Sequence, residues 1–300
     1  MNDKKKEPLF HIVKRDALPW YQSVGIRAIA IVLALIVCAV VTMILTGTNP
    51  IQVFQSIIAG AFGSARKTWI TFQNIAILLL ISLALTPAFK MKFWNIGGEG
   101  QVLIGGLASA ACMICLAEKL PAALVVVCMI VTSIAAGAFW AFIPAFFKSK
   151  WNTNETLSTL MMNYIATQLV AFFTIVWEVP KGSGKIGIIN QNSNVGWLPQ
   201  AFGSKYLLSI LVAVLITVFM YIYLKYSKHG YEISVVGESE NTAKYVGIKV
   251  EKVIMRTMAL SGAVCGLVGL LLVGGINHTI TTTIAGGQGF TAVMVSWMSK

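Results

Sequence analysis

Long apolar blocks separated by short charged segments constrain this chain more than any other feature. Only 11% of the residues are charged and the mean hydropathy is +0.77, whereas soluble domains carry roughly 25% charged residues. A helix needs about 20 apolar residues to cross about 30 Å of hydrocarbon. Seven blocks approach that length, at residues 24–46, 69–89, 96–116, 122–147, 156–177, 206–224 and 253–276. The sequence therefore predicts an all-α, polytopic transmembrane helix bundle.

The basic residues predict how this bundle is oriented. With the N-terminus in the cytoplasm, sixteen lysines and arginines fall inside. Six fall outside: Arg66, Lys67, Lys119, Lys181, Lys185 and Lys205. The positive-inside rule favours this orientation, with a cytoplasmic tail at 1–23 and a cytoplasmic loop at 226–252. The net charge of +12 is then a topology signal, and because no basic stripe is interleaved with aromatics, we expect no nucleic-acid partner.

The last apolar stretch, residues 289–300, would be only about 18 Å long as a helix. That is too short to cross the membrane. We therefore expect about seven spans plus a truncated eighth, in a chain that is C-terminally truncated or ends in a re-entrant segment. The sequence predicts one transmembrane domain over residues 1–300.

A first polar constellation lies at the start of the third block, in the segment Trp-Asn-Ile-Gly-Gly-Glu-Gly-Gln at 94–101. Its polar side chains are Asn95, Glu99 and Gln101. Polar groups at this depth have to face protein or water rather than lipid. Glu99 is thus a candidate either for the lining of a pathway or for a structural hydrogen bond to a neighbouring helix.

A second constellation opens the fifth block. Asn154 followed by Glu155 predicts an N-cap with an acid in the first turn. Thr156, Thr159 and Asn163 recur at three- and four-residue spacing, so they share one helix face. Such a stripe looks into the bundle or a water path, although Ser, Thr and Asn also join helices without further function.

Other motifs argue against chemistry by the chain itself. The histidines, His11, His229 and His278, lie in separate segments without zinc-ligand spacing, so we expect no metal. No nucleophile motif or phosphate loop is present, so the sequence predicts no catalytic residue and no cofactor. Gly262 and Gly266 form GxxxG, which is typical of close helix packing.

Three segments resemble one family. They are FWNIGGEGQVLIGGLASA from Phe93, NETLSTLMMNYIA from Asn154 and VVGESENTAKYVGIKVEKVIMRTMALSGAVCGLVGLLLV from Val235. They resemble the permeases of bacterial sugar, nucleoside and branched-chain amino-acid ABC importers. The closest branch is that of nucleoside or simple-sugar permeases that work with a basic-membrane-lipoprotein type binding protein. Lys90 and Lys92 depart from the pattern, because relatives often have fewer charges there.

This resemblance implies a permease subunit that moves a small polar solute across the bacterial cytoplasmic membrane by alternating access. Separate ABC ATPase subunits would hydrolyse ATP, and the other partners would be a second permease and an extracytoplasmic lipoprotein. The resemblance places Asn95, Glu99, Gln101, Thr156, Thr159 and Asn163 near the pathway. It places a coupling helix of the 226–252 loop in a cleft of the ATPase, with Gly237, Glu238, Asn241, Ala243, Tyr245 and Gly247 at the interface.

Two other classes of protein remain as alternatives. A secondary transporter driven by an ion gradient needs intramembrane acids and commonly has inverted repeats. Only Glu99 and, at a helix end, Glu155 could serve as such acids, and no repeat is legible. A membrane enzyme or a scaffold that does not transport is the third class, and the absence of a nucleophile-base pair disfavours the enzyme.

Overall fold

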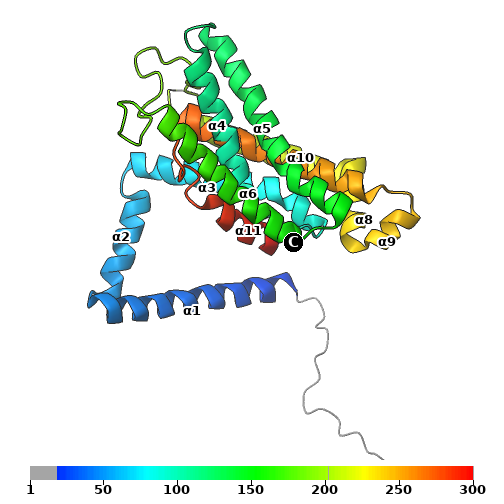
Figure 1. Ribbon diagram of the computed structural model, residues 1–300. Helices are drawn as coiled ribbons and strands as arrows, with labels where there is room; N and C mark the ends of the chain where they lie inside the picture. Colours follow the sequence, from blue (N-terminus) through cyan, green and yellow to red (C-terminus); the bar gives the residue numbers. More distant parts are fainter. Residues whose placement is uncertain (1–18, 202, 300) are drawn as a thin grey trace, which may run out of the picture. The chain divides into compact units, whose positions relative to one another are not determined.

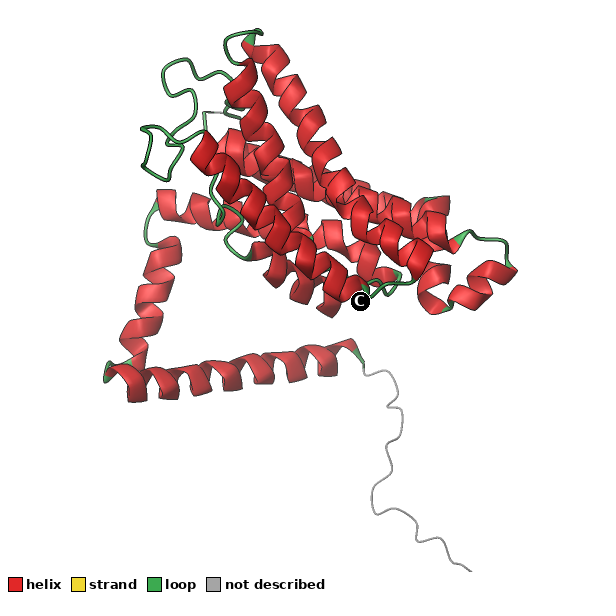
Figure 2. Ribbon diagram, in the orientation of Figure 1, coloured by secondary structure: helices red, strands yellow, loops and turns green. Residues whose placement is uncertain are grey.

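The computed structural model describes residues 19–201 and 203–299, and within these ranges it is helical without strands (Figures 1 and 2). Among the described residues, seven helical segments are long and apolar enough to cross a membrane: Tyr21–Thr46, Ala65–Lys90, Gly98–Leu116, Ala122–Trp151, Glu155–Val176, Leu207–Tyr226 and Val250–Asn277. Each overlaps one predicted block, and their ends differ from the predicted ends by four residues or fewer. The predicted all-α transmembrane bundle is confirmed.

The described helices fall into two compact units, Met1–Lys67 and Thr68–Lys300. The prediction of one domain over 1–300 therefore stays a prediction. The first unit contains α1 (Trp20–Thr46) and α2 (Pro50–Phe62). Most of the predicted tail at 1–23 lies outside the described residues, and its last residues already belong to α1.

The helix α2 was not predicted, because its 13 residues are too few for a membrane span. Local signals for it are nevertheless present. Asn49 accepts a hydrogen bond from the N–H of Ile51 at 3.0 Å, and Pro50 occupies the first helical position, where its missing N–H costs nothing.

The second unit is built around α4 (Gly98–Leu116), α5 (Ala122–Trp151) and α10 (Val250–Leu270) (Figure 1). Glycines line their contacts. A Cβ added to Gly105 of α4 would overlap the backbone of Gly266 of α10, and one added to Gly137 of α5 would overlap the carbonyl oxygen of Gly262. Small residues let helix backbones approach closely in a membrane, so the predicted packing role of Gly262 and Gly266 is confirmed.

The remaining elements surround these three helices. They are α3 (Ala65–Lys90), α6 (Glu155–Val176), α7 (Leu207–Tyr226), α8 (Lys228–Glu238), α9 (Glu240–Tyr245), the π-helix η1 (Leu271–Asn277) and α11 (Gln288–Met298). The middle part of α3 is buried, with Leu80, Ile81 and Leu85 in one apolar cluster with Val268 of α10. By contrast, α7 buries only Ser209, Ala213 and Met220, and a helix that faces lipid is expected to bury few of its side chains in the protein.

Helix signals predicted at 238–245 are confirmed by α9, whose N-cap Ser239 accepts from the N–H of Thr242 at 3.2 Å. The preceding helix α8 was not predicted. Its glycines, Gly230 and Gly237, lower the intrinsic helix propensity of this segment. The cap at Ser227, which accepts from the N–H of Gly230 at 3.0 Å, is the local signal for its start.

Candidate functional site

Five of the six polar side chains predicted near a pathway lie around the connector before α4, the first turn of α4 and the facing side of α6. We call these five the polar knot: Asn95, Glu99, Gln101, Thr159 and Asn163. All five are buried. Asn95 lies in the connector between α3 and α4. It donates to Ser261 Oγ of α10 at 3.2 Å, and its Oδ1 accepts from the N–H of Gly97 at 3.0 Å and from Gln101 Nε2 at 3.2 Å.

Helix α6 holds the other side of the knot. Asn163 Oδ1 accepts from the N–H of Gly100 at 2.9 Å, and its Nδ2 donates to the carbonyl oxygen of Ile96 at 2.9 Å. Thr159 Oγ1 accepts from the N–H of Ile96 at 3.2 Å. The predicted shared face of α6 is therefore buried at Thr159 and Asn163, whereas Thr156, one turn earlier, is half-buried. The predicted N-cap is also present, since Asn154 accepts from the N–H of Leu157 at 3.1 Å.

Glu99 connects the knot to α11. Its two carboxylate oxygens accept from the N–H of Gly287 at 2.9 Å and from that of Gly289 at 2.7 Å. Gly287 is the N-cap of α11, with φ of 73°. An anion is stabilised at a helix N-terminus, where N–H groups lack partners and the dipole is positive. Of the two interpretations left open for Glu99, the structure shows the hydrogen bond to a neighbouring helix.

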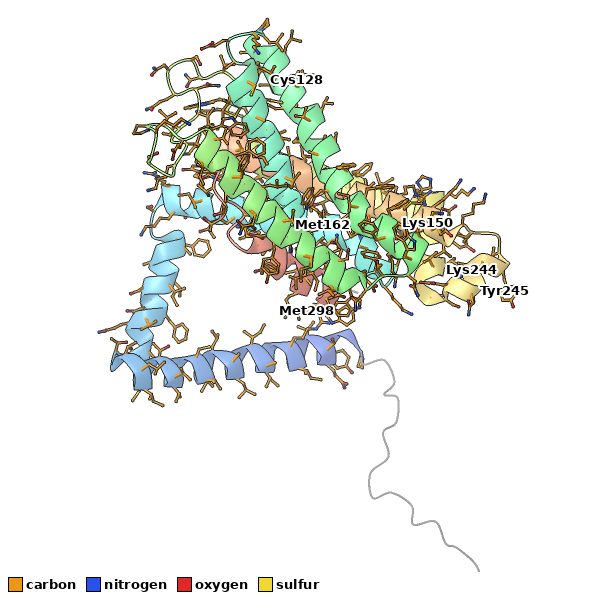
Figure 3. All side chains as sticks on the ribbon, viewed as in Figure 1. Cys128, Lys150, Met162, Lys244, Tyr245 and Met298 are labelled. Carbon is orange, nitrogen blue, oxygen red and sulfur yellow. The ribbon has the colours of Figure 1, made fainter. Side chains whose placement is uncertain are left out.

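The predicted coupling loop divides into exposed and buried residues. Glu238, Asn241, Tyr245 and Gly247 are exposed, Tyr245 by 92%. Figure 3 shows Tyr245 projecting from the α8–α9 end of the second unit.

Two residues of the same loop, Gly237 and Ala243, are buried. A Cβ on Gly237 would overlap the carbonyl oxygen of Lys90. Lys92 Nζ donates to the carbonyl oxygen of Glu238 at 3.4 Å. These contacts attach the loop to the end of α3, and they leave the four exposed residues as the accessible surface.

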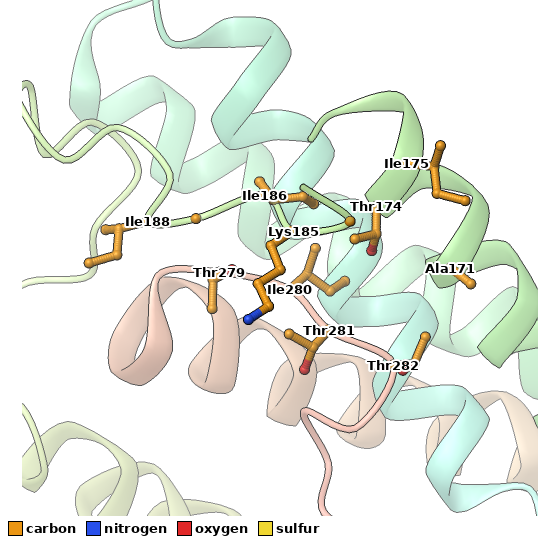
Figure 4. Close-up of a pocket in the computed structure, with 12 residues that line it drawn as sticks. Ala171, Thr174, Ile175, Lys185, Ile186, Ile188, Thr279, Ile280, Thr281 and Thr282 are labelled. Carbon is orange, nitrogen blue, oxygen red and sulfur yellow. The ribbon is translucent and has the colours of Figure 1, made fainter. Parts of the chain in front are cut away.

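A cavity of about 730 Å³ lies between the end of α6, the loop at 184–188 and the segment 279–282 (Figure 4). Thr174, Thr279, Thr281 and Thr282 line it, and the side chain of Lys185 points from the loop toward the 279–282 segment. The sequence analysis did not predict this cavity. Four threonines among residues 279–283 were the local signal for it.

The long loop at 178–206 is fastened to the end of the π-helix. The N–H of Ile189 donates to the carbonyl oxygen of His278 at 2.8 Å, and the rings of Trp197 and His278 stack with centroids 3.7 Å apart. Burial lowers the pKa of His278, and the charge of Lys205 lowers it further. His278 is therefore neutral near pH 7.

Glu178 organises the start of this loop. Its carboxylate accepts from the N–H groups of Gly182 at 2.7 Å and Gly184 at 2.8 Å. These hydrogen bonds to the charged form lower the pKa of Glu178. Across the described residues, no group of three or more His, Cys, Asp or Glu side chains is arranged to hold a metal ion.

Comparison with known proteins gives a consistent family. The chain is 31% identical over 272 residues to the guanosine ABC transporter permease protein NupP of Bacillus subtilis, covering 89% of this chain and 77% of NupP. It is 26% identical to the glucose ABC transporter permease protein TsgB13 of Haloferax volcanii, covering 95% and 77% of the two chains. It is 27% identical to the nucleoside ABC transporter permease protein NupB of Lactococcus lactis, covering 83% and 70%. No solved structure matches the chain.

The family model described as "Branched-chain amino acid transport system / permease component" matches residues 68–299. Nothing in these comparisons favours a secondary transporter driven by an ion gradient. Permeases of this family are transport subunits rather than enzymes, and their importers also contain a separate ATPase and a substrate-binding protein. This multi-pass membrane protein therefore belongs to the branched-chain amino acid transport system permease family and is the membrane-spanning permease subunit of an ABC importer.

Proposed function

We propose that this permease moves a nucleoside, with a simple sugar as the second candidate, across the bacterial cytoplasmic membrane. The observation that carries the proposal is the 31% identity to a guanosine permease over 89% of the chain. The 27% identity to a second nucleoside permease also supports a nucleoside as the solute. The 26% identity to a glucose permease supports a sugar as the second candidate.

The cavity at the end opposite α8 and α9 suits such a solute. Nucleosides and sugars are neutral and rich in hydroxyl groups, so their binding needs hydrogen-bond partners on a largely apolar wall. The hydroxyls of Thr279, Thr281 and Thr282 can each donate and accept, while that of Thr174 donates to the carbonyl oxygen of Val170 at 2.8 Å and can still accept. Its lining includes Lys185 but no carboxylate, so an amino acid would find no partner there for its ammonium group. We propose that this cavity is the entrance where a binding lipoprotein delivers the solute.

We propose that the polar knot shapes the wall of the pathway. The side chains of Asn95, Asn163 and Glu99 already form hydrogen bonds within the protein through both of their terminal polar atoms. Their role in this proposal is therefore to hold α4, α6 and α11 in place at the pathway. Gln101 Oε1 is buried with no protein partner, and Thr156 is half-buried at the entry of α6. Of the six side chains predicted near the pathway, we propose that these two contact the solute.

At the other end, we propose that Glu238, Asn241, Tyr245 and Gly247 contact the ATPase. Gly237 and Ala243 are buried beneath these four residues and pack the loop against the rest of the second unit. In this proposal α8 and α9 lie in the cytoplasm, and the N-terminus lies on the same side because six of the spans found in the described residues precede α8. A second permease, identical or related, would complete the pathway by alternating access.

Competition of uptake tests the solute. Cells that express the importer take up labelled guanosine in the presence of excess adenosine, uridine, glucose or fructose. Inhibition by nucleosides alone is the expected result. If guanosine is not taken up but labelled glucose or fructose is, a sugar replaces the nucleoside, and importer-dependent uptake of none of them would refute both.

Co-purification tests the coupling surface. Tyr245→Ala and Glu238→Arg are expected to abolish recovery of the ATPase, while the permease stays in the membrane. Both side chains are exposed, so neither change removes buried packing. The matched control is Tyr164→Ala, which removes an aromatic ring of 61% exposure from α6. Equal ATPase recovery by all three variants would contradict the assignment.

A further inference from the structure

A basic cleft lies where α8 meets the start of α10, and it borders the exposed surface assigned to the ATPase, with which it shares Gly247. Its volume is about 430 Å³. Its charged lining consists of Lys228, Glu232, Lys249, Lys252 and Arg256. We use "basic cleft" for this cavity and these five side chains.

The carboxylate in the basic cleft is already neutralised. Glu232 Oε2 lies 2.8 Å from Arg256 Nη2. Among the described residues, no ion pair joins Lys228, Lys249 or Lys252 to a carboxylate. Three lysines thus line one hollow without an ion pair to a carboxylate, so the site favours an anion.

Two further features of the basic cleft also favour binding of an anion. Lys249 is the N-cap of α10 and makes no side-chain capping bond, and Glu251, the acid in the first turn, pairs with Lys150 at 3.1 Å. The N–H groups at this helix end therefore lack a side-chain cap, and the helix dipole favours an anion there. The Nε of Arg256 is buried without a protein partner. A buried donor of this kind needs an acceptor from a ligand or water.

The position of the basic cleft along α10 indicates the source of the anion. The span Val250–Asn277 has 28 residues, or about 42 Å at 1.5 Å per residue. That exceeds the roughly 30 Å hydrocarbon core and matches the 40–45 Å that includes both headgroup layers. The first two turns of α10, which carry Lys252 and Arg256, therefore lie at headgroup depth.

Exposed aromatic residues support this depth. Tyr226 ends α7 and is 69% exposed, and Tyr231 on α8 is 61% exposed. Tyrosines gather at the boundary between the membrane and water. Lys228 comes two residues after Tyr226, so it too lies at this boundary.

We propose that the basic cleft binds the phosphate of an anionic phospholipid headgroup. The leaflet is the one that faces the coupling loop, and its cytoplasmic identity rests on the orientation proposed above. The lipid joins the start of α10 to α8 within the coupling loop.

Native mass spectrometry of the detergent-purified permease tests this binding. The probes are phosphatidylglycerol, phosphatidylcholine and inorganic phosphate, each added alone. The variant combines Lys228→Gln, Lys249→Gln and Lys252→Gln, and the control combines Lys119→Gln, Lys181→Gln and Lys205→Gln, which remove the same charge elsewhere. Since each basic residue contributes about 1 kcal/mol to binding of anionic lipid, we expect about fivefold weaker phosphatidylglycerol binding per lysine and about 100-fold for the triple variant.

A second triple variant, with arginine at the same three positions, should restore phosphatidylglycerol binding, which separates charge from misfolding. Equal binding of phosphatidylglycerol and phosphatidylcholine, or an equal loss in the control, would overturn the proposal. So would binding of inorganic phosphate as tight as that of the lipid, which would assign a soluble anion. If lipid binding is unchanged but ATPase recovery falls only in the glutamine variant, the basic cleft belongs to the ATPase interface. Solute uptake is not part of this assay, so its result is independent of the proposed solute.

Discussion

Substitution of Gly266 by alanine is the sharpest test of how the three central helices pack. A Cβ at Gly266 would overlap the carbonyl oxygen of Ser133 on α5 and lie 3.2 Å from the Cα of Gly137. These are backbone atoms, so no side chain can rotate away and α5 itself has to move. On the other side, Gly105 of α4 is packed against the same glycine, which leaves little room for α10 to retreat.

The magnitude follows from this geometry. Overpacking of a tight core by one methyl group costs about 1–3 kcal/mol, and we expect the upper value because backbone opposes backbone. A loss of about 3 kcal/mol lowers the melting midpoint of a unit of this size by about 6–12 °C. The assay is the temperature at which half of the detergent-purified permease loses its monodisperse elution.

The same span supplies a matched control. A Cβ on Gly275 would lie 3.5 Å from Leu198 Cδ1 and meet nothing closer, which is ordinary van der Waals contact. Gly275→Ala should therefore melt within about 2 °C of the parent chain, since it adds no overlap. The packing argument fails if Gly266→Ala melts with the parent chain, or if Gly275→Ala loses as much as Gly266→Ala.

Changes at three further residues test the polar contacts. Glu99→Ala leaves the N–H groups of half-buried Gly287 and buried Gly289 without an acceptor, and the buried one alone costs about 1–3 kcal/mol. Glu99→Gln keeps one acceptor, so its melting midpoint should fall less. Asn163→Ala removes two hydrogen bonds to the start of α4 and should lower the midpoint by several degrees, whereas an unchanged midpoint would mean that water replaces the amide. The pKa of His278 is lowered in the folded chain, so stability should be constant above about pH 6.5 and fall as the pH drops further through the folded pKa. His278→Phe keeps a ring against Trp197 and should remove this pH dependence; a dependence that persists would assign it to another group.

Local patterns in the sequence were sufficient to predict the spans. Apolar length located all seven, and the helix start at Asn154 followed from its side chain alone. The polar stripe of α6 was also predicted correctly as one face, because a helix repeats every 3.6 residues whatever surrounds it. Each of these signals is contained within about twenty neighbouring residues.

The partners of the polar side chains could not be predicted in this way. Glu99 bonds to Gly287 and Gly289, which are 188 and 190 residues later in the sequence. The sequence also could not predict which residues of the coupling loop are exposed and which are buried. Gly237, for example, is buried by the end of α3 and not by its neighbours in the sequence. Tertiary contacts determine these features, and no local periodicity records them.

The described contacts form a continuous path from the coupling loop to the polar knot. Gly237 of α8 packs on the carbonyl oxygen of Lys90, and the chain then continues through the connector to Asn95. The connector is held by α6 and α10, and the first turn of α4 holds α11 through Glu99. In the coupling proposed above, a displacement of α8 by the ATPase would meet no free space at Gly237 and would carry the end of α3 with it. Because the same connector leads into α4, we propose that motion of the loop reaches the polar knot through packed backbone rather than through flexible side chains.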